Sequence, residues 1–171
     1  MRLPLALAAL ALALAGAAAA EPPAPPPPKD FATMSAQSDQ YEIQAGRTAA
    51  AQTTDPRVRS FAQQMILDHG QTSEAVGRAA AASGLPPPPP AMGADQARML
   101  SALQSLRGPD FDRAYMKQQV LAHHEALAVQ QTYAAAGKDP NLRRTAEQAV
   151  PLIQHHLDMA QQLKMALGGD D

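Results

Sequence analysis

Residues 61–69 read FAQQMILDH and place Phe61, Met65 and His69 four residues apart. Side chains at this spacing lie above one another on one face of an α-helix. Because the stripe is mostly apolar, it is the face that a helical bundle would bury. A histidine on that face has to find a polar partner, since an imidazole inside a hydrocarbon core is costly without one.

Prolines, glycines and capping residues divide the chain into four long helices and one short connector helix. The sequence predicts helices over residues 31–53, 56–83, 94–106, 109–136 and 140–167. Asp55 and Asp139 each precede a proline at the first helical position, and Asp30 is the expected cap of the first helix. Strand-forming residues are few. The predicted fold class is all-α, a four-helix up-down bundle with a short extra connector helix.

The first twenty residues have the order of a secretory signal peptide. Arg2 precedes a Leu/Ala core, and Ala18-Ala19-Ala20 forms a cleavage site before Glu21. The core is shorter than the ~20 flanked residues of a stable membrane span. We therefore expect cleavage after Ala20 and a periplasmic or otherwise exported protein with no transmembrane helix. An uncleaved membrane anchor is the alternative.

Two proline-rich segments organise the rest of the chain. Residues 21–29 predict an extended stalk, and residues 86–90 predict a linker between the two helical halves of one domain over residues 30–168. The chain has no cysteine, which excludes disulfide staples and thiolate chemistry. Its net charge of −2 makes nucleic acid an unexpected partner.

The last predicted helix has the clearest buried stripe. Its members alternate four and three residues apart: Leu142, Ala146, Ala149, Ile153, His156, Ala160, Leu163 and Leu167. Pro151 should bend this helix just before the histidine. In the helix before it, periodicity does not decide whether His123 or His124 faces the core. The first helix carries Glu42 among small residues.

Four signatures in order along the chain resemble an exported bacterial family, domain of unknown function 4142. They lie at residues 61–69, 108–115, 120–123 and 151–157. The resemblance covers about residues 31–167 and implies a ferritin-like bundle outside the cytoplasm with no established reaction. The family's helix histidines fall on His69, His123 and His156, and its first-helix glutamate falls on Glu42. The resemblance therefore favours His123 over its neighbour.

The chain also departs from the family pattern. Gln119 and Ala122 stand where the family commonly has methionine and aspartate. One soft ligand and one carboxylate are thereby missing, which weakens the case for a metal in this member.

One histidine or glutamate from each long helix forms a candidate metal site. Its proposed ligands are Glu42, His69, His123 and His156, with Met65, Asp68 and Met159 as supporting residues. Imidazole and carboxylate groups suit copper, zinc or iron, and bundle cores are where such sites are built. The alternative is packing: the histidines bond one another, the glutamate or a buried water, and the methionines fill gaps.

The sequence offers no catalytic motif. It lacks the Glu-x-x-His pattern of di-iron bundles, a nucleophile triad and a phosphate loop. We therefore expect a non-catalytic binding or envelope-stress module. A protein–protein interaction or structural envelope module is the alternative, with an envelope protein or a second copy of the chain as partner.

Buried histidines also lead to a pH expectation. A neutral imidazole in a dry core should have a depressed pKa, because burial disfavours the charged form. Folding stability should then be full above the unfolded pKa of about 6.5 and decline below it.

Overall fold

The computed structural model describes residues 23–168, and its regular elements are all helices. They are α1 (Pro28–Gln52), α2 (Pro56–Ala82), α3 (Ala94–Gln104), α4 (Gly108–Ala136) and α5 (Pro140–Ala166). The all-α fold class is confirmed, and the helix ends differ from the predicted ones by at most three residues. The expected signal peptide and the start of the stalk lie outside the described residues. Within residues 23–168, no helix combines the length and apolar character of a membrane span.

Two of the three expected aspartate caps are present. Asp55 and Asp139 accept hydrogen bonds from backbone N–H groups at the starts of α2 and α5. The prediction for Asp30 is wrong, because α1 begins at Pro28 with Pro27 as its N-cap and no side-chain cap. The ring of proline fixes φ near its helical value, and proline has no N–H that needs a partner. The helix therefore starts earlier than it would with the aspartate as its cap. Asp30 lies instead in the first turn, where a carboxylate favours the helix dipole.

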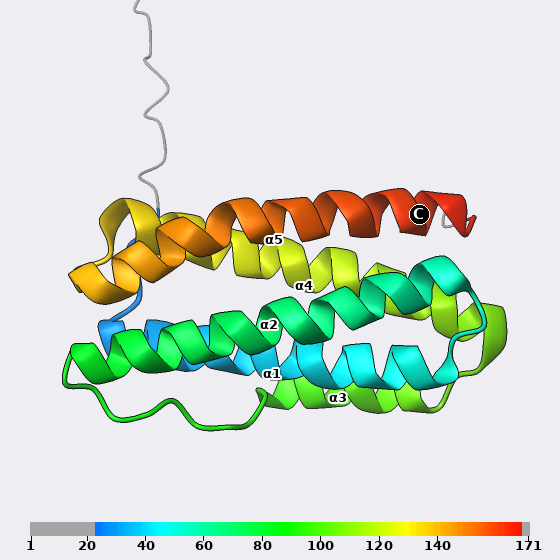
Figure 1. Ribbon diagram of the computed structural model, residues 1–171, viewed down its shortest axis with the longest axis horizontal. Helices are drawn as coiled ribbons and strands as arrows, with labels where there is room; N and C mark the ends of the chain where they lie inside the picture. Colours follow the sequence, from blue (N-terminus) through cyan, green and yellow to red (C-terminus); the bar gives the residue numbers. More distant parts are fainter. Residues whose placement is uncertain (1–22, 169–171) are drawn as a thin grey trace, which may run out of the picture.

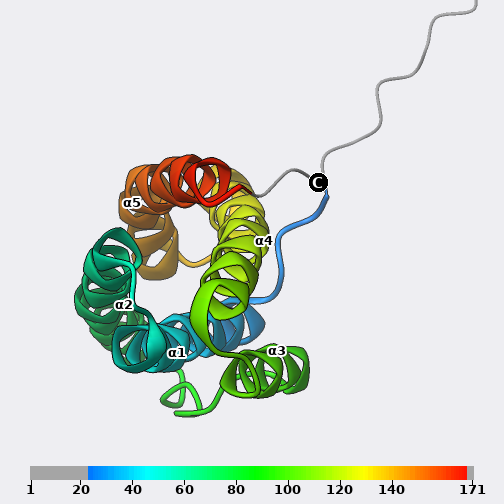
Figure 2. The same ribbon diagram turned by 90° about the vertical axis from the view of Figure 1, so that its right-hand side faces the viewer.

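The four long helices form two hairpins around a common interior. Figure 1 shows α1 running antiparallel to α2, and α4 antiparallel to α5. The end-on view in Figure 2 shows α3 outside this ring, where it packs against α1 and α4. Residues 83–93 and α3 carry the chain back along the bundle, so that α4 starts at the end where α2 starts (Figure 1). One lengthwise crossover of this kind is typical of ferritin-like bundles.

Two large apolar clusters make up most of the core. The first contains Tyr41, Phe61, Met65, Phe111 and Tyr115, all buried. The second packs further along the helices and contains Phe31, Val76, Tyr133 and Leu142. A smaller third cluster packs α4 against α5.

A buried polar layer lies between the two large clusters, judged by the order of residues along each helix. It consists of Ser35, Asp39, Glu42, His69, Gln119, His123, Gln130 and His156, all less than a tenth exposed. The four long helices all contribute to this layer. An Ala-rich bundle therefore has a polar centre with apolar packing on both sides.

Gly46 sets the approach of α1 to α2. A Cβ atom at this position would lie 2.9 Å from the backbone oxygen of Ala62 and 3.0 Å from Cγ1 of Ile66. Both of these atoms belong to α2. Only a hydrogen atom fits between the two helices here.

We expect Gly46→Ala to lower the free energy of unfolding by about 1–3 kcal/mol, because the new methyl group meets a backbone carbonyl that cannot rotate away. This cost exceeds the gain of about 1 kcal/mol that alanine normally brings over glycine inside a helix. Gly77→Ala is the matched control in α2, where nothing lies within 4 Å of the added Cβ. Urea unfolding should show the control to be more stable than the parent. Equal effects at the two positions would contradict the close approach.

Candidate metal centre

Three histidines from three helices meet in the polar layer. His69 of α2, His123 of α4 and His156 of α5 are 2%, 1% and 0% exposed. Their ring centroids are 5.3–5.6 Å apart, and one nitrogen from each ring lies within 4.8 Å of the others. We call these residues the histidine cluster. His124 and His155 are exposed, so the core-facing member of each pair is the one that the family resemblance indicated.

Two of these histidines are held by carboxylates of neighbouring helices. His69 donates from Nδ1 to Oδ1 of Asp39 on α1 at 2.8 Å. His156 donates from Nε2 to Oδ2 of Asp68 on α2 at 2.9 Å. The two bonds connect α1 to α2 and α2 to α5. Asp68 thus contacts a histidine as the sequence predicts, although the histidine lies on another helix.

The third histidine is held by its own helix. His123 donates from Nδ1 to the backbone oxygen of Gln119, one turn earlier in α4, at 2.9 Å. Carboxylate and carbonyl oxygens can only accept, so in all three rings the proton lies on the bonded nitrogen. The opposite nitrogen of each neutral ring then carries a lone pair.

The three opposite nitrogens have no partner within the described residues. They are Nε2 of His69, Nε2 of His123 and Nδ1 of His156, each shielded from solvent. An unsatisfied buried polar atom costs about 1–3 kcal/mol. Three neutral imidazoles in one buried cluster cannot satisfy one another through these nitrogens, but a cation can accept a lone pair from each ring. The donor set therefore fits a metal ion, which imidazole nitrogens bind at about 2.0–2.1 Å.

Glu42 lies beside the cluster and is not one of its converging groups. Its side chain is buried, and Oε2 accepts a hydrogen bond from Nε2 of Gln119 at 2.6 Å. Oε1 is 3.8 Å from Nδ1 of His123, the nitrogen already bonded to the Gln119 carbonyl. To act as a direct ligand, Glu42 would have to leave Gln119. Its present position is that of a neighbouring carboxylate.

The two methionines named from sequence pack in the apolar cluster next to the polar layer. Met65 is wholly buried with Phe61 and Tyr115, and Met159 packs half-buried against the same cluster. Each is within one helical turn of a cluster histidine along the chain. In this arrangement they close one side of the polar layer.

The pKa values in the layer move in opposite directions. Burial and, second to it, the charge of His69 lower the pKa of His123 to about 3 and that of His156 to about 4. Burial raises the pKa of Glu42 to about 7. For His69, burial acts downward, but the hydrogen bond and charge of Asp39 outweigh it, so the pKa is raised. The expectation of depressed values is confirmed for His123 and His156 and wrong for His69.

Asp39 is the functional residue that sequence reasoning missed. It is 6% exposed, and its Oδ1 accepts from both His69 and Thr72, at 2.8 Å each. Residue spacing could have placed Asp39 on the buried face, because it lies four residues after Ser35 and three before Glu42 on the same face of α1. A carboxylate on a buried stripe needs a partner, and the partner is a histidine.

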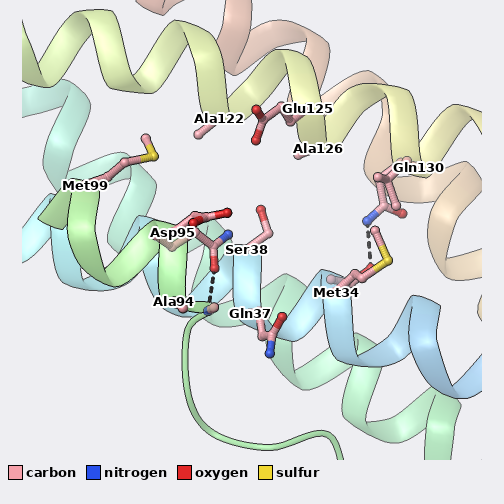
Figure 3. Close-up of a pocket in the computed structure, with 14 residues that line it drawn as sticks. Met34, Gln37, Ser38, Ala94, Asp95, Met99, Ala122, Glu125, Ala126 and Gln130 are labelled. Atoms are coloured by element: carbon pink, nitrogen blue, oxygen red, sulfur yellow. Dashed lines mark hydrogen bonds between the residues drawn. The ribbon is translucent and has the colours of Figure 1, made fainter.

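A separate hollow lies outside the ring of long helices. Figure 3 shows this pocket of about 310 Å³ between α1, α3 and α4, with Asp95 and Glu125 on opposite walls. Gln130 lines one end, where its amide donates to Ser35 at 3.1 Å. None of the three cluster histidines lines it.

We expect Glu42→Gln to change stability in a pH-dependent way. Because its folded pKa of about 7 is above the unfolded 4.5, Glu42 contributes stability that is full below pH 4.5 and is lost as pH rises through 7. The amide of glutamine cannot ionise. From pH 4.5 to pH 8, the free energy of unfolding of the variant should therefore rise by about 3 kcal/mol relative to that of the parent. Chemical unfolding at both pH values measures this difference. The same stability difference at both would contradict a proton held by Glu42.

Solved structures with this fold come from several sources. A DUF305 fragment from Deinococcus radiodurans has a TM-score of 0.69 and 21% identity, covering 86% of this chain and 99% of that one. A DUF305 protein from Streptomyces coelicolor, described as secreted, has a TM-score of 0.72 and 14% identity, covering 85% and 96%. CopM in its Cu(II)-bound form has a TM-score of 0.71 and 16% identity, covering 83% and 98%. At these identities the likeness shows the fold alone.

No curated protein matches the chain. A family match does exist, and it spans residues 13–163, which is most of the sequence. It includes all four signatures and all three cluster histidines. The chain therefore belongs to the family described as domain of unknown function DUF4142.

Proposed function

We propose that this protein is an exported, non-catalytic binding protein whose histidine cluster holds one transition metal ion. One observation carries the proposal. Three buried imidazoles meet with one nitrogen of each ring within 4.8 Å of the others, and each ring has one nitrogen without a partner while its other nitrogen is bonded to an acceptor. Packing alone explains the bonded nitrogens and leaves the three unpartnered ones unexplained.

The surroundings of the cluster are those of a metal centre. Metal-bound histidines typically donate their second N–H to a carboxylate or a backbone carbonyl, which fixes the ring and strengthens the ligand. Asp39, Asp68 and the Gln119 carbonyl fill that role here. The nearby carboxylates also favour a cation over a neutral ligand in a site closed to water. When bound, the metal would be held by His69, His123 and His156 and would join α2, α4 and α5.

Copper is the metal to test first, ahead of zinc and iron. Three imidazoles suit all of these ions, and for a given nitrogen site the divalent series places copper highest. The shared fold with CopM in its Cu(II)-bound form supports this order as an analogy. The adjacent Met65 and Met159 would favour copper(I) if a sulfur turned toward the cluster.

Export of the protein is supported by two observations. The Leu/Ala segment at residues 1–20 has the pattern of a secretory signal peptide. The similar protein from Streptomyces coelicolor is described as secreted. An oxidising compartment outside the cytoplasm would also expose the protein to Cu(II) rather than to thiol-buffered copper.

An interaction or structural envelope module remains the second candidate function, with the histidines serving only packing. The large apolar side chains that are exposed lie on four different helices: Met34, Leu67, Leu121 and Met165. A docking face on one helix pair would instead gather them on two neighbouring helices. The observations therefore favour the metal site.

Titration of the metal-stripped protein with Cu(II) and, separately, with Zn(II) should show one bound ion per chain, measured by elemental analysis after gel filtration. Binding should raise the melting temperature, because the ion stabilises only the folded state, by about 2.7 kcal/mol at a hundred times the Kd. The double substitution His69→Ala and His156→Ala should abolish stoichiometric binding.

The control for this experiment is His124→Ala with His155→Ala, which removes the same number of histidines from the exposed neighbours of the cluster. This variant should keep the stoichiometry. A parent protein that stays metal-free at micromolar metal, or a control that loses binding equally, would refute the buried site.

A further inference from the structure

A metal site whose ligands are at most 2% exposed needs a route for the ion. A pocket of about 300 Å³ opens between α2 and α5 and reaches inward to α1 and α4. We call it the α2–α5 pocket. At its inner end lie Asp39 of α1 and Gln130 of α4, two members of the polar layer. It thus extends from the surface to a side chain bonded to the histidine cluster.

Two oxygen atoms of residues that line this pocket have no partner among residues 23–168. They are Oδ2 of Asp39 and Oε1 of Gln130, from residues only 6% and 7% exposed. The other oxygen of Asp39 accepts from His69 and Thr72, and the amide nitrogen of Gln130 donates to Ser35. Each side chain is therefore anchored by one atom and leaves one acceptor unused. Two unused acceptors at one pocket fit a ligand that brings positive charge or N–H and O–H donors.

The walls of the α2–α5 pocket suit a hydrated cation. Asp39 and Arg78 are its charged lining residues. The other polar side chains that line it are neutral: Gln71, Thr72, Gln130, Thr145 and Gln148. The guanidinium of Arg78 is 71% exposed and pairs with Glu74 at 3.4 Å. A hydrated ion can therefore pass neutral hydrogen-bonding groups before it meets the Asp39 carboxylate.

Two further pockets do not reach the residues that support the cluster, although Gln130 also lines the pocket in Figure 3. The pocket in Figure 3 and a pocket of about 600 Å³ between the start of α2 and the end of α5 are not lined by Asp39, Asp68 or Gln119. These three residues are the ones that hydrogen-bond the cluster histidines. The α2–α5 pocket, by contrast, is lined by Asp39, one of these three residues.

We propose that the α2–α5 pocket is the uptake route of the metal ion, and that Oδ2 of Asp39 and Oε1 of Gln130, which are shielded from solvent, bind the ion first as it loses its water shell. This inference rests on the proposed function. Oxygen ligands replace water in the ion's shell at little cost, and the imidazole nitrogens then replace the oxygens because transition metals bind them more strongly. Asp39 thus serves twice, by orienting His69 and by receiving the ion.

Stopped-flow mixing of the metal-stripped full chain with Cu(II) tests this route. The readout is the quenching of fluorescence from the three tyrosines, in a chain without tryptophan. Gln130→Met removes the unpartnered oxygen, together with the amide that donates to Ser35, and keeps the side-chain length, whereas Ala75→Leu fills the α2–α5 pocket. Both should slow uptake about tenfold, and in Ala75→Leu the equilibrium affinity should stay near that of the parent, since Ala75 bonds no cluster histidine and no ligand of the ion.

Ser60→Leu is the matched control, because it adds the same bulk on the same helix but fills the other pocket between α2 and α5. It should take up Cu(II) at the parent rate. Parent-like uptake in Gln130→Met and Ala75→Leu, with full metal binding, would overturn the route and leave the metal site standing. Slower uptake in Ser60→Leu alone would also overturn it. A parent that binds no Cu(II) would overturn both the route and the site.

Discussion

The need to satisfy buried imidazoles and carboxylates without water is the constraint around which this bundle is organised. Asp39 and His69 pair across α1 and α2, and Asp68 and His156 pair across α2 and α5. Removing Asp39 or Asp68 would leave a buried histidine without its partner, which costs more than the pair contributes. The apolar clusters on both sides exclude water from the layer and so make these bonds obligatory. The pairs thereby hold neighbouring helices in a single register.

The same bonds determine what the layer can bind. Each histidine has one nitrogen committed to an acceptor, and the other nitrogen has no partner within the described residues. Burial keeps His123 and His156 neutral, which leaves them ready to act as ligands. Asp39 has the opposite effect on His69, where a proton competes with any metal. A cation entering the layer would displace that proton and take over its interaction with the carboxylates.

Sequence periodicity identified most of the fold and part of the site, and its misses share a cause. His69 and His156 were placed correctly because their stripes are long and regular. His123 needed the family resemblance, because two adjacent histidines lie on overlapping faces of one helix. Asp39 was missed because its partner is 30 residues away on another helix. The early start of α1 at Pro28 was missed because an aspartate and a proline compete locally to begin the helix.

The amino-acid sequence by itself determined the helices, their buried faces and the lack of thiol chemistry. It also determined how far along its own helix each histidine lies. These properties depend on residue type and on spacing along a single helix. Only the tertiary structure decided which nitrogen of each ring is bonded, that Glu42 stands beside the cluster, and that Asp39 raises the pKa of His69. Those outcomes depend on distances of a few ångströms between helices, which arise when the side chains of all four long helices pack together.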